Sequence, residues 1–127
     1  MQLRVLPDRL SIVRLPTNAP WPQPPTGTSF FAAVRTTDEI SVVCVQDAAP
    51  HHEEARIESD WRALEVAGPL DFGMVGVMAA ITGSLSEVGV SVVIVSTFDT
   101  DYLLVRAESL DTTVAALRSA GHDIEAG

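Results

Sequence analysis

A turn rich in acids and hydroxyls is the first place where this sequence could bind a ligand. It lies between two apolar runs, residues 90–95 and 102–107. Its members are Thr97, Phe98, Asp99, Thr100 and Asp101. A minimal hairpin would use Asn-Gly or Gly-Gly here, whereas these carboxylates could bind an ammonium or a guanidinium group. The alternative is a solvated turn in which Asp99 bonds to its own backbone.

A second segment, residues 71–76, offers backbone donors. Its sequence is DFGMVG, and it stands between an expected strand and an expected helix. Free N–H groups in the first turn of a helix attract carboxylate or phosphate, and Gly73 and Gly76 would let a ligand approach the backbone closely. In the alternative interpretation, Asp71 only caps the helix and the glycines only serve the turn. The glycine spacing matches neither a dinucleotide fingerprint nor a P-loop, so it does not support nucleotide binding.

Together the two segments predict a site with opposite charges at its two ends. The helix start would hold a carboxylate, and the acidic turn would hold an ammonium or a guanidinium group. A molecule that carries both groups is an amino acid. The acids of the turn favour an amino acid with a cationic side chain.

The elements that would position these segments lie in residues 61–127. Apolar residues at spacings of 4, 3, 4 and 3 predict a helix that ends at Gly89, and a second apolar stripe predicts a helix that ends at Gly121. Residues 61–68, 90–95 and 102–107 are typical of strands, and the last residues leave room for a short one. The order is β-α-β-β-α-β, which is a ferredoxin-like unit of the α+β class.

The first half, residues 1–60, resembles a degenerate copy of the second. Strands are expected over residues 9–15, 29–35 and 40–45, but residues 16–27 hold five of the eight prolines. That density predicts an extended loop instead of a first helix. Thr36 and Asp38 match Thr97 and Asp99 at a constant offset of 61 residues. The match indicates two units in tandem, although two acidic hairpins can also resemble each other by chance.

Composition narrows the classes of function. The net charge is −9, from 17 acidic and 8 basic residues, which disfavours nucleic acid and anionic membrane as partners. A single cysteine permits no internal disulfide, and no signal or membrane-spanning segment is recognisable, so a cytoplasmic protein is expected. His51 and His52 lack the spacing of metal ligands. With no nucleophile and base in evidence, we expect no catalysis, no metal and no cofactor.

Two stretches resemble a known family. The segments "LDFGMVGVMAAITGSLSEVGVSVVIVSTFDTDYLLV" and "TDEISVVC" look like the small tandem ACT-domain proteins. These are related to the ACT modules of aspartate kinase and to the cytosolic arginine sensors of animals. ACT domains are ferredoxin-like modules that pair side by side and bind amino acids at the seam. The resemblance therefore implies a non-catalytic, homodimeric amino-acid sensor that acts as an allosteric regulator.

The resemblance also implies a ligand site at the seam between ACT units, built from the strand-to-helix loop and the acidic turn and completed by a strand of the first unit. Its residues are Asp71, Phe72, Gly73, Met74, Val75, Gly76, Thr97, Phe98, Asp99, Thr100, Asp101, Ile40, Ser41 and Val42. Two alternatives remain open. One is a structural or dimerisation module without a ligand, and the other is a small enzyme that uses the acidic turn.

Overall fold

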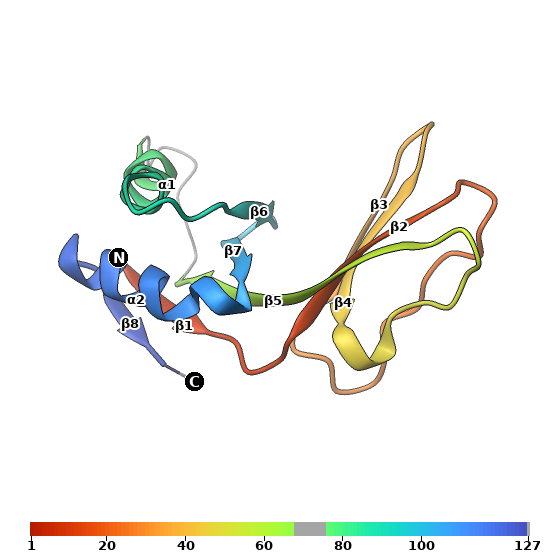
Figure 1. The fold of residues 1–127 in the computed structure, drawn as a ribbon, viewed down its shortest axis with the longest axis horizontal. Coiled ribbons are helices and arrows are strands. Elements are labelled where there is room, and N and C mark those ends of the chain that lie inside the picture. Colours follow the sequence, from red (N-terminus) through yellow and green to blue (C-terminus); the bar gives the residue numbers. More distant parts are fainter. Residues whose placement is uncertain (68–75, 127) are drawn as a thin grey trace. The chain divides into compact units, whose positions relative to one another are not determined.

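The computed structural model describes residues 1–67 and 76–126, and its contacts divide the chain into two units. The helical unit comprises residues 1–7 with the described residues from 62 onward, and the sheet unit comprises residues 8–61. Figure 1 labels the elements along the chain. One long strand, β5 (Arg56–Val66), gives its first half to the sheet unit and its second half to the helical unit.

The helical unit confirms the predicted α+β, ferredoxin-like fold. Besides its half of β5, it contains β1 (Gln2–Val5), α1 (Val77–Glu87), β6 (Val93–Ser96), β7 (Asp101–Arg106), a 3-10 turn (Ala107–Ser109), α2 (Leu110–Ser119) and β8 (Asp123–Glu125). From β5 onward the order is β-α-β-β-α-β. The strands lie side by side in the order β6-β7-β5-β1-β8.

Strand β1 was not anticipated from the sequence. It lies between β5 and β8, antiparallel to β5 with Leu3 opposite Val66, and parallel to β8 with Leu3 opposite Ile124. Residues 2–5 alternate between exposed and buried, which is the pattern of a strand with one covered face. The first residues of the chain therefore complete the sheet of the helical unit.

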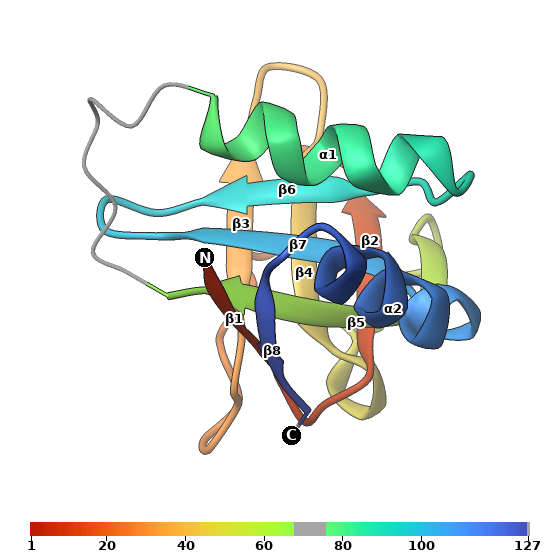
Figure 2. The ribbon, with the colours of Figure 1, turned by 90° about the vertical axis from the view of Figure 1, so that its left-hand side faces the viewer.

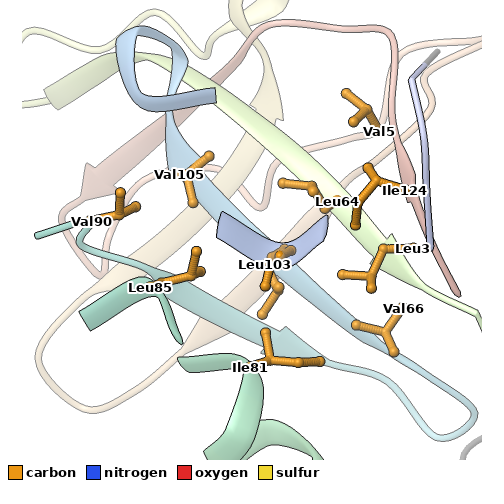
Figure 3. Close-up of a cluster of buried hydrophobic side chains, with 11 residues drawn as sticks. Leu3, Val5, Leu64, Val66, Ile81, Leu85, Val90, Leu103, Val105 and Ile124 are labelled. Atoms are coloured by element: carbon orange, nitrogen blue, oxygen red, sulfur yellow. The ribbon is translucent and has the colours of Figure 1, made fainter. Parts of the chain in front are cut away.

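One face of this sheet carries the core of the helical unit. Both helices lie on that face (Figure 2), and the side chains that meet there are drawn in Figure 3. Every second residue of β1, β5 and β7 points toward the helices, because side chains alternate along a strand. The buried members are Leu3, Val5, Leu64, Val66, Ile81, Leu85, Val90, Leu103, Val105, Leu117 and Ile124.

Both helices of this unit end at a glycine, as the sequence predicts. Gly89 has a φ of 75°, and its N–H donates to the carbonyl of Ser86 at 3.1 Å. Gly121 has a φ of 94°, and its N–H donates to the carbonyl of Arg118 at 3.0 Å. Glycine adopts this left-handed conformation without the steric cost of a Cβ atom.

The sheet unit keeps the strands of the ferredoxin-like fold without its helices. Its strands are β2 (Leu10–Leu15), β3 (Ala32–Arg35), β4 (Ile40–Val45) and the first half of β5, with a 3-10 turn at Gln46–Ala48. They pair antiparallel in the order β3-β4-β2-β5. Residues 8–61 are all described and contain no α-helix. Proline removes a backbone donor and clashes with the preceding turn, which explains why residues 16–27, with their five prolines, are not helical.

Loop residues take the place of the missing helices over one face of this sheet. The buried cluster there consists of Val13, Leu15, Ile40, Val42 and Cys44, against which Ala19, Phe31, Ala49 and Ala55 pack. Burial raises the pKa of the Cys44 thiol. A protonated, enclosed thiol is a poor nucleophile, so Cys44 serves the core.

Asp60 adopts a left-handed conformation at a bulge in β5, with a φ of 65°. Its carboxylate lies 3.2 Å from Arg9. We expect Asp60→Val to lower the free energy of unfolding by about 1–2 kcal/mol, because a β-branched residue is strained at positive φ.

Asp60→Asn is the matched control for this prediction. Asparagine tolerates positive φ and removes the same charge, and exposed ion pairs contribute little, so the change should stay below about 0.5 kcal/mol. Urea denaturation measures both variants. Equal losses in the two would show that the ion pair, not the backbone conformation, makes this position sensitive.

Candidate functional site

The turn between β6 and β7 is held by Thr97. Its N–H donates to the carbonyl of Thr100 at 2.8 Å. Its hydroxyl donates to the same carbonyl at 3.1 Å and accepts from the N–H of Thr100 at 3.2 Å. Asp99 takes no part in these bonds. A threonine-closed turn therefore replaces the Asx turn that was the alternative interpretation.

The two acids of the turn differ in their surroundings. Asp101 accepts a hydrogen bond from the hydroxyl of Ser96 at 2.5 Å. The Asp99 carboxylate is exposed and has no hydrogen-bond or ion-pair partner within residues 1–67 and 76–126. Phe98 beside it is 81% exposed. Asp99 is thus the carboxylate of this turn that a ligand could bind without displacing a protein partner.

The turn lies beside the C-terminal end of β5. The hydroxyl of Thr100 donates to the carbonyl of Val66, the last residue of that strand. Residues 68–75 follow this strand end, so Asp71, Phe72, Gly73, Met74 and Val75 of the predicted site lie outside the described residues. Gly76, the next described residue, is the N-cap of α1. It has a φ of 90°, and no side chain caps the helix. Its carbonyl accepts the first helical hydrogen bond, from Ala80 at 2.9 Å.

The corresponding turn of the sheet unit has the same construction. The N–H of Thr36 donates to the carbonyl of Glu39 at 2.9 Å, and its hydroxyl accepts from the N–H groups of Asp38 and Glu39, both at 3.2 Å. The sequence match between the two hairpins thus reflects a shared turn closed by threonine. The two turns differ in how their acids are paired. In the sheet unit, Nε of Arg14 lies 3.5 Å from the Glu39 carboxylate and partly neutralises it.

The three residues of β4 in the predicted site have different accessibility. Ile40 is 2% exposed, and both Ile40 and Val42 belong to the core of the sheet unit. Ser41 is half-buried. The backbone of β4 pairs with β2 on one side and with β3 on the other. Of these three side chains, only that of Ser41 has appreciable exposed surface, and the contact of all three residues with a ligand stays a prediction.

Sequence reasoning missed a polar array on the face of the helical unit's sheet opposite the helices. Glu65 accepts a hydrogen bond from Arg4 at 3.3 Å and another from the Tyr102 hydroxyl at 3.1 Å. Burial, followed by the contact with Glu65, raises the pKa of Tyr102. The array joins β1, β5 and β7. It could not be predicted from the sequence, because the pairing of β1 with β5 was not predicted.

Within residues 1–67 and 76–126, no group of three histidine, cysteine or acidic side chains could hold a metal ion. In the same residues, no helix has the length and apolar character needed to cross a membrane.

Family comparisons cover both units. Residues 56–119 match the family model described as the ACT domain, and residues 8–52 match a second model, described as an N-terminal domain. No curated protein matches the chain. The ACT match spans β5 to α2, which are the elements that position the acidic turn.

Solved structures resemble the chain over almost its whole length. A protein from Agobacterium tumefaciens is 33% identical, over 99% of this chain and 92% of its own, with a TM-score of 0.88. The ligand-free regulatory subunit of aspartate kinase from Thermus thermophilus is 13% identical, over 89% of this chain and 93% of its own, with a TM-score of 0.61. The aspartate kinase of Clostridium acetobutylicum is 12% identical, over 90% of this chain and 33% of its own, with a TM-score of 0.67.

The two aspartate kinases share the fold with this chain at low identity. The predicted resemblance to aspartate kinase ACT modules is confirmed at the level of the domain family and the fold. None of these comparisons tests the resemblance to the animal arginine sensors, which stays a prediction.

Proposed function

This chain belongs to the ACT domain family, and we propose that it is a non-catalytic regulatory module that binds an amino acid in the cytoplasm. The ACT match over residues 56–119 is the observation that carries the proposal, because it covers the acidic turn and the helix start that the sequence singles out. The regulatory subunit of aspartate kinase from Thermus thermophilus shares this fold over 93% of its own length.

The acidic turn is the part of the proposed site that the described residues support best. Thr97 fixes the backbone of the turn through three hydrogen bonds, one made by its N–H and two by its hydroxyl, so the turn needs little ordering when a ligand binds. Asp99 offers an exposed carboxylate without a protein partner among the described residues. The amino group or a cationic side chain of the ligand would bind there, and the loop of residues 71–76 would hold its carboxylate.

The ligand is best identified from the protein as it is purified. We expect native mass spectrometry to detect an amino acid retained by the chain. A thermal-shift screen against the common amino acids should then raise the melting temperature with the same compound, because a ligand that binds only the folded state stabilises it. A chain that retains none and is stabilised by none would be a structural module.

We also propose that the chain forms a homodimer through α1 and β6. Strand β6 pairs only with β7 among the described strands, so its other edge has free backbone groups. Val93 and Ile94 on this strand are 38% and 44% exposed. Small residues of α1, among them Ala79 and Gly83, line a hollow of about 620 Å³ beside it. A hollow lined by uncharged residues next to an unpaired strand edge suits a second copy of the same surface.

The dimer proposal is tested by charging the edge strand. We expect light scattering to give twice the chain mass for the unaltered protein and a single chain mass for Ile94→Lys, because a buried unpaired ammonium is costly. Val34→Lys is the matched control, since Val34 is 58% exposed in the sheet unit, and it should remain dimeric. A dimer that survives Ile94→Lys would place the interface elsewhere.

A further inference from the structure

A hollow of about 590 Å³ lies beside β1 and β8 of the helical unit and shares no residue with the acidic turn. Its volume is in the range of roughly 300–1,000 Å³ that is typical of small-ligand sites. Six of its lining residues are ionisable, namely Arg4, Glu65, Arg118, His122, Asp123 and Glu125. They come from β1, the end of β5, α2, the turn after α2 and β8, so the hollow exists only because β1 is inserted into this sheet.

Two guanidinium groups in this lining are held in place by the protein. Arg4 donates from Nη2 to Glu65, which is itself fixed by the Tyr102 hydroxyl. Arg118 donates from Nη2 to the carbonyl of Ile124 at 2.8 Å. Each guanidinium carries five N–H donors in a planar fork. Both arginines therefore keep donors with which they can bind a carboxylate, at a reduced cost in side-chain entropy.

Two further carboxylates, those of Asp123 and Glu125, belong to the same lining. Asp123 lies opposite Gln2 and Glu125 lies opposite Arg4 in the parallel pairing of β8 with β1. Within residues 1–67 and 76–126 neither carboxylate has a hydrogen-bond or ion-pair partner. Residues opposite each other in a ladder point to the same face, so these acids stand on the face that carries Arg4. They can bind an ammonium group close to the guanidinium.

The lining of the hollow combines both signs of charge. It contains two guanidinium groups and the three carboxylates of Glu65, Asp123 and Glu125. The amino-terminal ammonium lies 3.3 Å from Nδ1 of His122, another lining residue. The carboxylates repel a free phosphate, and the cations repel a simple ammonium compound. A ligand that brings both signs of charge satisfies the two kinds of group.

We propose that this hollow is a second binding site, for a small zwitterion that carries one carboxylate and one ammonium group. An amino acid and a dipeptide share this chemistry, and the volume admits either. The site goes beyond the proposed regulatory function, because none of its residues belongs to the acidic turn or to the loop before α1.

Nuclear magnetic resonance of the 15N-labelled chain, at 13.6 kDa, locates binding residue by residue. The probes are alanine, alanylalanine, N-acetylalanine, alaninamide and inorganic phosphate. We expect at least one of the two zwitterions to shift the amide resonances of residues 2–4 and 122–125, and their relative affinities distinguish an amino-acid site from a dipeptide site. The analogues that lack one charged end should bind at least tenfold more weakly, because each loses a charge-assisted hydrogen bond, and phosphate should shift none of these resonances.

Two variants test the two charged ends of the zwitterion separately. Arg4→Gln removes a guanidinium that binds the carboxylate of the ligand, and it should weaken binding at least tenfold. Glu125→Gln removes a carboxylate that binds the ammonium of the ligand, and it should also weaken binding at least tenfold. Arg35→Gln and Glu108→Gln make the same changes of net charge at exposed positions outside the hollow, and they should leave the affinity unchanged. Equal affinities in all four variants, or resonance shifts for no zwitterion at millimolar concentration, would overturn the proposal.

The same spectra separate this site from the acidic turn. Shifts confined to residues 97–101 would overturn the second site and leave the proposed function standing. Shifts confined to residues 2–4 and 122–125, unchanged by Asp99→Asn, would support the second site while removing the turn from ligand binding.

Discussion

Replacing Asp99 with Asn is expected to lower the affinity for the bound amino acid at least tenfold. The substitution keeps the size of the side chain and removes its charge, and a hydrogen bond to a charged group contributes about 1.5–3 kcal/mol, or roughly ten- to a hundredfold in affinity. The melting temperature without ligand should hardly change, because Thr97, not Asp99, closes the turn. Calorimetry with the amino acid that the unaltered protein retains measures the affinity.

The matched control for this prediction is Asp38→Asn. Asp38 occupies the equivalent position in the threonine-closed turn of the sheet unit, and its replacement changes the net charge by the same amount. It should leave the affinity within about twofold of the original value, because Asp38 is not a residue of the proposed site and salt screens the charge of an exposed side chain. Asp101→Asn should have a smaller effect than Asp99→Asn, because Asp101 already accepts from Ser96. Unchanged affinity in both Asp99→Asn and Asp101→Asn would leave the dimerisation module as the function.

Replacing Leu103 with Ala is expected to give a large loss of stability, about 2–5 kcal/mol of unfolding free energy. Leu103 is 0% exposed and lies in β7 among side chains from both helices and three other strands. Truncation removes apolar contacts and leaves a cavity that packed neighbours on both sides fill only in part. Urea denaturation followed by circular dichroism measures the loss.

Phe98→Ala is the control for this large effect within the same hairpin. Phe98 has a larger side chain than Leu103 but is 81% exposed, so its truncation should change the unfolding free energy by less than about 0.5 kcal/mol. If Phe98→Ala instead weakens amino-acid binding without loss of stability, the ring contacts the ligand. A loss for Leu103→Ala below about 1 kcal/mol would contradict the core described here.

Local patterns in the sequence determined most of the secondary structure and the class of fold. The apolar spacing of α1 and the glycine after each helix specify the two helices, because a helix is stabilised by contacts between residues three and four positions apart. The proline-rich segment excludes a helix by itself, since each proline lacks an N–H group. The acidic turn was also recognisable from its neighbours in the chain. All of these features depend on residues that are close in sequence.

Tertiary structure alone decided which side chains around the turn are accessible. In the alternative interpretation of the sequence, Asp99 bonds to its own backbone, whereas the structure closes the turn with the hydroxyl of Thr97. The sequence did not show that Ile40 and Val42 belong to the core of the sheet unit, where β4 pairs between two strands, and their contact with a ligand stays a prediction. A shift of register by one residue would exchange the two faces of a strand, so accessibility depends on partners that a single segment does not specify.

The insertion of β1 is the clearest case of long-range determination. Gln2, Leu3, Arg4 and Val5 are a plausible strand by alternation, but nothing within them selects β5 and β8 as neighbours. Those partners lie more than fifty residues away in the chain, and they become adjacent only when the apolar faces of three strands are buried together against the helices. The tethered arginine and the free carboxylates of the second site follow from that pairing, which is why the sequence by itself gave no sign of them.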